Sequence, residues 1–342
     1  MNKADICNLT LKELEKAVVE SGMPRYRAAQ IFSWIYCKGA RGFEDMHNIP
    51  KDIRDRMDSR YSIAALELSD RRGPSDNTEK FLFKLSDGNF VETVLIYSGK
   101  RETLCLSTQV GCKYACSFCA SGKKGFTRDL RPSEILNQIL YIKSVLKHEI
   151  TNYVFMGMGE PLDNYDNLAK SIKIMNDPRG LAIGARRITV STCGIVSGIR
   201  KLKNLGIQIN LSVSLHAAND ILRSELMPIN RRYPLKELIS ACKDFLDQNG
   251  RMITLEYILI KGKNDSLKDI DELSKIADKL KAKVNIIACM RVPQSDFVSP
   301  DTEEIKTFIE RLKRRRVNAI LRGSRGGDIN AACGQLAGKA KG

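Results

Sequence analysis

The sequence of 342 residues lacks an apolar run of about 18 residues, the length that a membrane-spanning helix needs. It also lacks internal repeats and low-complexity segments. The opening residues, MNKADICNLTLKELEKA, are polar and contain no apolar signal core, so we expect a cytoplasmic protein without membrane attachment. Hydrophobic residues make up 43% of the chain, a globular fraction that excludes disorder as its overall state.

Acidic residues are too few to balance the basic ones, since 40 Asp and Glu stand against 56 Lys and Arg and leave a net charge of +16. An excess of this size suits a polyanion, and nucleic acid is the commonest polyanion in a cytosol. A merely soluble basic surface is the alternative interpretation. An anionic membrane surface is disfavoured, because no basic helix carries a strong aromatic face. The basic clusters are spread along the chain, at 71–72, 123–124, 186–187, 231–232 and 311–316.

Residues 1–68 are predicted to form a small, basic, helical domain that could bind RNA. Apolar residues recur there at helical spacing, with Thr10 as the expected N-cap of the first helix. Residues 69–100 are predicted to form a β-hairpin extension, because Asp87-Gly88 separates two alternating apolar runs.

Residues 101–325 alternate strand and helix patterns in about six βα units, which predicts an α/β fold with a parallel sheet and outer helices. Six units are fewer than the eight of a closed barrel, so we predict a partial (β/α)6 barrel. Residues 326–342 form a separate C-terminal segment rich in Gly and Ala. The predicted strands cover residues 103–109, 152–157, 186–192, 208–216, 252–260, 283–289 and 318–323.

Ten cysteines in a cytosolic protein indicate metal binding or redox chemistry rather than structural disulfides. Four of them have apolar neighbours, and we interpret them as small core residues. These four are Cys7, Cys37, Cys193 and Cys242.

Cys112, Cys116 and Cys119 form a C-x3-C-x2-C loop directly after the first predicted barrel strand. Three thiolates can hold three irons of a [4Fe–4S] cluster and leave the fourth iron open to a substrate. Zinc is the competing interpretation, but no fourth Cys or His follows at a short spacing. Phe118 would shield such a cluster from water, or simply pack in the core.

This loop and several later segments resemble the RlmN–Cfr family of RNA adenine methylating enzymes, within the radical-SAM superfamily. The segments occur in the family's order and spacing, from the helical domain almost to the last residue. They are TLCLSTQVGCKYACSFC, MGMGEPLDN, ITVSTCGI, SVSLHA, LMPIN and GDINAACGQLAG.

The resemblance implies a radical-SAM barrel that binds S-adenosylmethionine. Gly159 and Glu160 would meet the amino group of this cofactor, and a carboxylate suits an ammonium. The residues that would hold its ribose and carboxylate lie after the third and fourth barrel strands. They are Ser191, Ser214, Leu215 and His216. The alternative for each hydroxyl is a helix cap or a loop hydrogen bond.

Three further catalytic residues follow from the resemblance alone. Cys333 matches the cysteine that carries the methyl group, Cys105 matches the second catalytic cysteine, and Glu92 matches the base. In the family, a carbon radical formed from S-methylcysteine adds to an electron-poor adenine carbon and gives a protein–RNA adduct. Cys105 would release this adduct by forming a disulfide with Cys333.

The sequence departs from the family pattern at the sixth predicted strand. A Pro-aromatic-Asn step is usual there, but this chain reads NIIACMRVP and places Met290 where the Asn contacts the cofactor. Met cannot donate an amide hydrogen bond. Either a neighbour such as Gln294 substitutes, or the chain is a divergent paralogue. We interpret Cys289 as a packing residue.

The predicted activity is methylation of C2 of an adenosine in 23S ribosomal RNA, with transfer RNA as a second candidate substrate. A C8-methylating enzyme of the antibiotic-resistance type uses the same cysteines and stays open. Two readings from other classes are an Fe–S RNA-binding protein without S-adenosylmethionine turnover and a radical activase for a partner protein. We expect a monomer that takes electrons from a low-potential donor such as flavodoxin or ferredoxin.

Overall fold

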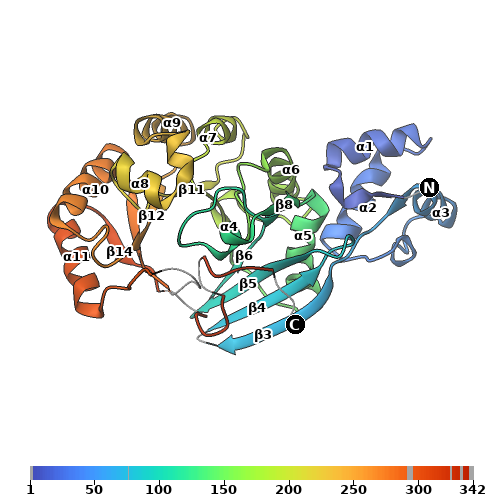
Figure 1. Ribbon diagram of the computed structural model, residues 1–342. Coiled ribbons are helices and arrows are strands. Elements are labelled where there is room, and N and C mark those ends of the chain that lie inside the picture. The colour runs from blue at the N-terminus through green and yellow to red at the C-terminus, as the bar shows by residue number, and fades with distance from the viewer. Residues whose placement is uncertain (1–2, 76, 291–295, 324–325, 332–333, 339–342) are drawn as a thin grey trace.

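The computed structural model describes residues 3–75, 77–290, 296–323, 326–331 and 334–338. Short helices form the first part of the chain, which lies at one side of the molecule (Figure 1). They are α1 (Leu11–Glu20), α2 (Tyr26–Tyr36) and α3 (Lys51–Arg60). The Thr10 hydroxyl accepts the Glu13 amide and the Glu13 carboxylate accepts the Thr10 amide, so the predicted N-cap is confirmed. A short parallel ladder of β1 (Ala4–Asp5) and β2 (Tyr61–Ser62) closes this part.

A single ten-stranded sheet runs through the rest of the described chain, in the order β14-β13-β12-β11-β10-β9-β6-β5-β4-β3. The strands from β6 to β14 pair in parallel, which confirms the predicted α/β fold. These strands are β6 (Arg101–Cys105), β9 (Asn152–Phe155), β10 (Ile188–Thr192), β11 (Asn210–Ser214), β12 (Ile253–Leu259), β13 (Lys283–Ala288) and β14 (Ala319–Leu321).

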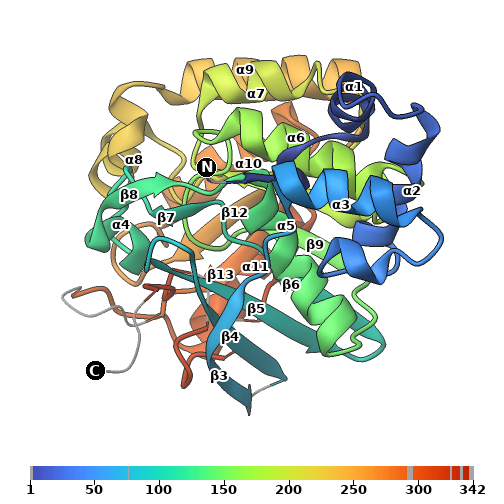
Figure 2. The same ribbon diagram turned by 90° about the vertical axis from the view of Figure 1, so that its right-hand side faces the viewer.

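Helices connect the parallel strands and cover one face of the curved, open sheet (Figures 1 and 2). No helix in the described part of the chain is long and apolar enough to cross a membrane. The connecting helices are α5 (Pro132–Leu140), α6 (Tyr165–Asn176), α7 (Val196–Leu202), α8 (Asp220–Leu226), α9 (Leu235–Asn249), α10 (Leu267–Lys279) and α11 (Thr302–Arg314).

The predicted hairpin around Asp87-Gly88 is present and belongs to the same sheet. β3 (Glu67–Ser75), β4 (Thr78–Lys84) and β5 (Phe90–Ser98) are antiparallel, and β5 continues the ladder onto β6. The turn is stabilised by the Asp87 carboxylate, which accepts the Asn89 amide at 3.1 Å. The extension is therefore bonded to the barrel rather than appended to it.

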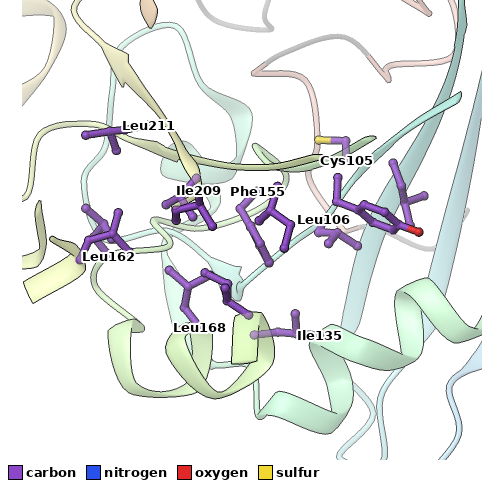
Figure 3. Packing of buried hydrophobic residues seen from close by; sticks show 14 of the residues in the cluster. Cys105, Leu106, Ile135, Phe155, Leu162, Leu168, Ile209 and Leu211 are labelled. Atoms are coloured by element: carbon purple, nitrogen blue, oxygen red, sulfur yellow. The ribbon is translucent and has the colours of Figure 1, made fainter. Parts of the chain in front are cut away.

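The core fills the space between the sheet and its helices. Figure 3 shows Leu106, Phe155 and Leu168 on the side of the sheet where Ile135 of α5 packs, and all four are fully buried. Each such side chain contributes about 1.5–3 kcal/mol relative to an exposed position. Cys105 precedes Leu106 and projects from the other side of the strand, as alternation along a strand requires.

Two predictions about this region are wrong. The strand predicted at 103–109 ends at Cys105, because the amides of Thr108 and Gln109 turn to the carbonyl of Met158 in the loop after β9. Cys37 was predicted in the core but is exposed at the end of α2, where its thiol donates to the Gly180 carbonyl at 2.9 Å. Cys7 and Cys242 are buried as predicted.

Candidate active site

A pocket of about 900 Å³ lies at the carboxyl ends of the parallel strands, where α/β proteins gather their working residues. Side chains from strands far apart in the sequence meet there. The polar and sulfur-containing residues that line it include Cys112, Cys116, Cys119, Glu160, Ser191, Cys193, Ser214, His216, Glu256 and Arg322.

The three clustered cysteines lie between β7 (Gln109–Gly111) and α4 (Ala120–Lys124). β7 pairs antiparallel with β8 (Phe126–Asp129), so a separate two-stranded sheet joins the two ends of the segment that contains the cysteines. The Cys112 amide donates to the Gly125 carbonyl and the Cys119 amide to the Cys116 carbonyl, each at 3.0 Å. Burial raises the pKa of the Cys112 thiol to about 12 and that of Cys116 well above its usual range. Iron binding must therefore release protons from these thiols.

The donor set of this loop fits a cubane better than a single ion. Within the described ranges, no three His, Cys, Asp or Glu side chains converge on a site for one metal ion. A structural zinc ion needs four ligands around one centre, whereas a cubane binds each thiolate at a different iron. Three thiols lining one pocket therefore match the cluster.

His216 forms the wall opposite this loop. Its ring meets Phe118 edge-on at 4.7 Å between centroids, and its Nδ1 accepts the Ile258 amide at 3.0 Å. The second nitrogen, Nε2, therefore carries the proton. Burial lowers the pKa of His216 to about 3, so the side chain stays neutral and can donate a hydrogen bond from Nε2.

Glu160 follows β9 and is almost completely buried. Its two carboxylate oxygens accept the amides of Leu162, at 3.0 Å, and Cys193, at 2.7 Å. Burial raises the pKa of this carboxyl group, although these amides oppose the rise. Gly159 has a φ of 96°, and a Cβ there would lie 2.5 Å from the Cβ of Gln109, so only glycine fits. Backbone hydrogen bonds and a glycine conformation thus fix this loop.

Ser191 and Ser214 lie near the carboxyl ends of β10 and β11, and both line the pocket. Leu215 does not line the pocket described here. Its side chain is buried in the core, and its amide donates to the Glu256 carbonyl at 3.0 Å. A direct contact from Leu215 would have to come from its backbone.

Glu256 and Arg322 are pocket residues that sequence reasoning missed. The Glu256 carboxylate accepts the Ser212 hydroxyl at 2.8 Å and the Asn285 amide at 3.0 Å. Arg322 forms an ion pair with the second carboxylate oxygen of Glu256 at 3.3 Å. The signal was a lone acidic residue within the apolar run MITLEYILI, because a buried central strand does not hold an unpaired charge.

Two family models match the chain. Residues 106–277 match the model of the Radical SAM superfamily, and residues 4–63 match the ribosomal RNA large subunit methyltransferase N-terminal domain. The chain is 44% identical to the dual-specificity RNA methyltransferase RlmN of Geotalea uraniireducens, over 99% of this chain and 98% of that protein. Identity to the RlmN of Pelobacter propionicus is 46%, over 98% and 96%. The chain belongs to the RlmN family of radical SAM proteins.

The fold agrees with that membership. A radical SAM methyltransferase from Sphaerobacter thermophilus, solved as a crystal structure, superposes with a TM-score of 0.93. The two chains are 42% identical, and the match covers 98% of this chain and all of that one. The predicted radical-SAM fold is confirmed.

The predicted catalytic residues Cys105 and Glu92 lie outside the pocket lining. Cys105 is buried at the end of β6, and Glu92 is buried on β5. Cys105 pairs with Val94, which lies two residues beyond Glu92 on the same strand, so both side chains project from one face of the sheet. One Glu92 oxygen accepts the amides of Ala337 and Gly338, at 2.7 and 2.9 Å.

The C-terminal segment passes beside the cysteine loop. The Ala120 amide donates to the Gly334 carbonyl at 2.7 Å, and the Ser121 hydroxyl donates to the Leu336 carbonyl at 2.6 Å. These two donors follow Cys119 directly in the sequence. Cys333 and Gln294 lie outside the described residues. Met290 is half-buried beside Gly327 and does not line the pocket as described.

Proposed function

We propose that this chain methylates C2 of an adenosine in 23S ribosomal RNA, with transfer RNA as a second substrate. Curated relatives that share 44–46% of its residues over nearly the full length are named dual-specificity RNA methyltransferases. The observation that carries the proposal is the pair of hydrogen bonds from Ala120 and Ser121 to the C-terminal segment. These bonds place the residues that flank Cys333 next to the cysteine loop.

The residues present fit the cofactors that the superfamily implies. Cys112, Cys116 and Cys119 would hold a [4Fe–4S] cluster, which when bound supplies the electron for reductive cleavage of S-adenosylmethionine. Glu160 is oriented by two backbone amides and keeps lone pairs for the ammonium group of this cofactor.

Polar groups across the pocket would orient the rest of S-adenosylmethionine. Ser191 and Ser214 offer hydroxyls, and His216 offers its Nε2 proton, to the ribose and the carboxylate. Gly159 and Leu215 contribute backbone groups. Met290 offers no amide, so the contact of the family's Asn is either lost or supplied by a neighbour such as Gln294.

The remaining roles belong to three side chains on the sheet and the C-terminal segment. Cys333 carries the methyl group, and Cys105 releases the RNA adduct by forming a disulfide with Cys333. Glu92 removes the ring proton. Lys80 bonds one oxygen of its carboxylate and two amides bond the other, and a carboxylate has about four acceptor positions, so it can take the proton while these bonds are kept.

A division of labour along the chain follows from these roles. Residues 1–68 serve as the RNA-binding accessory domain and residues 69–100 as the β-extension. Residues 101–325 form the radical-SAM barrel, and residues 326–342 form the segment that carries the catalytic cysteine. The enzyme works as a monomer with a low-potential donor such as flavodoxin or ferredoxin.

The test is an anaerobic assay with reconstituted protein, dithionite, S-adenosylmethionine and a ribosomal RNA fragment. Mass spectrometry of the nucleosides should show 2-methyladenosine with wild type and none with Cys333→Ala. The matched control is Cys37→Ala, since Cys37 is exposed and far along the chain from the pocket. Only 8-methyladenosine would reject C2 as the target. Absence of 5′-deoxyadenosine would favour an Fe–S RNA-binding protein instead.

A further inference from the structure

Arg223 in α8 has the largest side chain among the fully buried residues described, with 0% of it exposed. Among the described residues, its guanidinium donates to four neutral oxygens and to no carboxylate. The acceptors are the carbonyls of Cys193 (2.7 Å), Ser214 (3.2 Å) and Leu215 (3.2 Å) and the side-chain oxygen of Asn230 (2.8 Å).

The two acidic residues of the same helix, Asp220 and Glu225, have other partners, and Glu225 pairs with Lys263 at 3.1 Å. Asp220 accepts the Asn230 amide group at 2.9 Å and the Leu235 backbone amide at 2.8 Å. Carbonyl dipoles compensate a buried guanidinium only in part, and a buried charge normally requires an opposite charge. Burial lowers the pKa of Arg223, although the charge of Asp220 opposes the fall. In the part of the chain that the structure describes, no carboxylate forms an ion pair with the Arg223 guanidinium, whose bonds go to neutral oxygens.

The guanidinium lies directly behind the pocket wall. Cys193 and Ser214, whose carbonyls it holds, line the same pocket as the three clustered cysteines. The end of α8 also contacts the cysteine loop, because the Leu226 carbonyl accepts the Ser117 amide at 3.0 Å and its hydroxyl at 3.2 Å. Figure 2 shows α8 beside the loop that leads into α4.

The backbone around Arg223 also fixes its position. Gly194 leaves room for the guanidinium: its φ is 113°, and a Cβ there would lie 3.1 Å from Nη2 of Arg223. Backbone conformation and hydrogen bonds thus fix a cation at this position.

We propose that Arg223 supplies the counter-charge of the iron–sulfur cluster and raises its reduction potential. A cubane held by three thiolates is an anion and becomes more negative on reduction. A fixed cation in a low-dielectric wall therefore stabilises the reduced form more than the oxidised form. This inference rests on the cluster ligands of the proposed function and does not depend on the RNA substrate.

The test is a redox titration of the reconstituted protein, followed by electron paramagnetic resonance, without RNA or S-adenosylmethionine. At the midpoint potential of wild type, the ratio of reduced to oxidised cluster should fall roughly tenfold in Arg223→Gln, which corresponds to about 59 mV for one electron. Arg223→Lys keeps the charge and should restore most of the ratio. Arg231→Gln, at an exposed position eight residues later, is the matched control and should not change it.

A cluster of unchanged potential in Arg223→Gln overturns the inference. An equal fall of the reduced-to-oxidised ratio in Arg223→Lys and Arg223→Gln also overturns it. In that case the hydrogen-bond geometry of Arg223, and not its charge, would set the reduction potential. If Arg223→Gln takes up no cluster, the lysine variant alone decides between these outcomes. Wild type without iron would instead contradict the proposed function, and that failure is visible before any variant is made.

Discussion

Lys80 and Glu92 form an ion pair of 2.9 Å between neighbouring strands β4 and β5, with side chains only 7% and 5% exposed. Lys80 also donates to the Asn330 carbonyl at 3.0 Å, while Glu92 accepts the amides of Ala337 and Gly338. One buried pair therefore holds the C-terminal segment on both sides of Cys333.

Lys80→Met should loosen that segment. Removing one partner leaves a buried carboxylate uncompensated, at a cost of about 3–5 kcal/mol. Hydrogen exchange measured by mass spectrometry should show faster exchange at the amides of Ala337 and Gly338. Lys84→Met, at an exposed position on the same strand, is the control and should exchange like wild type. Unchanged protection in Lys80→Met would mean that the cysteine loop alone holds the segment.

Replacing Cys112, Cys116 or Cys119 by serine should abolish cluster assembly, because each thiolate would bind a different iron of the proposed cluster. Iron and sulfide analysis after anaerobic reconstitution measures this directly. Cys193→Ser is a demanding control, since Cys193 lines the same pocket, bonds Glu160 through its backbone amide and its thiol, and keeps a hydrogen-bond donor when it becomes serine. A loss of iron in Cys193→Ser equal to that of the three variants would add a fourth ligand to the set.

Cys105→Ala should trap the covalent RNA adduct on Cys333, since no thiolate is left to displace it. A denaturing gel with labelled RNA should show a protein-linked band that requires S-adenosylmethionine. The band should disappear when Cys333→Ala is added to the same variant. Full turnover by Cys105→Ala would remove this cysteine from the mechanism.

His216 should make the apoprotein less stable as the solution is acidified. The unfolded chain takes up a proton as the pH falls through about 6.5, but the folded protein keeps His216 neutral down to about 3. The unfolded state therefore binds more protons between these two pH values, and the free energy of unfolding decreases as the pH is lowered.

His216→Asn keeps an acceptor for the Ile258 amide but does not titrate in this range. Urea unfolding of both proteins from pH 7 to pH 5 should show wild type losing roughly 2 kcal/mol more than the variant. If the free energy of unfolding depended on pH equally in wild type and His216→Asn, the pKa of His216 would be the same in the folded and unfolded states.

The elements with strong periodicity were predictable from sequence. The runs ITVST and MITLEYILI are apolar and β-branched because both faces of a central parallel strand are buried, and β10 and β12 form there. The C-x3-C-x2-C spacing likewise needs no tertiary contact to be seen. By contrast, β7, β8 and α4 are three to five residues long and leave too short a pattern to detect.

Residues whose partners are distant in the sequence were missed. The sequence analysis did not single out Arg223, because the role proposed for it depends on carbonyls at two strand ends. Glu256 depends on Ser212 and Arg322 in the same way. For Cys37 the error was a predicted burial that the structure does not show. Apolar neighbours along a helix do not specify which side of the helix is covered.

The continuous ladder across the extension and the barrel has a mechanical consequence. Lys80, Val94 and Cys105 stand in one row on β4, β5 and β6, so two strand spacings of about 4.8 Å separate Lys80 from Cys105. Backbone hydrogen bonds fix this row, and a hinge between the extension and the barrel would have to break them. The spacing of Glu92 and Cys105 is therefore set by the sheet itself, so a change of distance between the two residues proposed to act on the adduct would require strand separation.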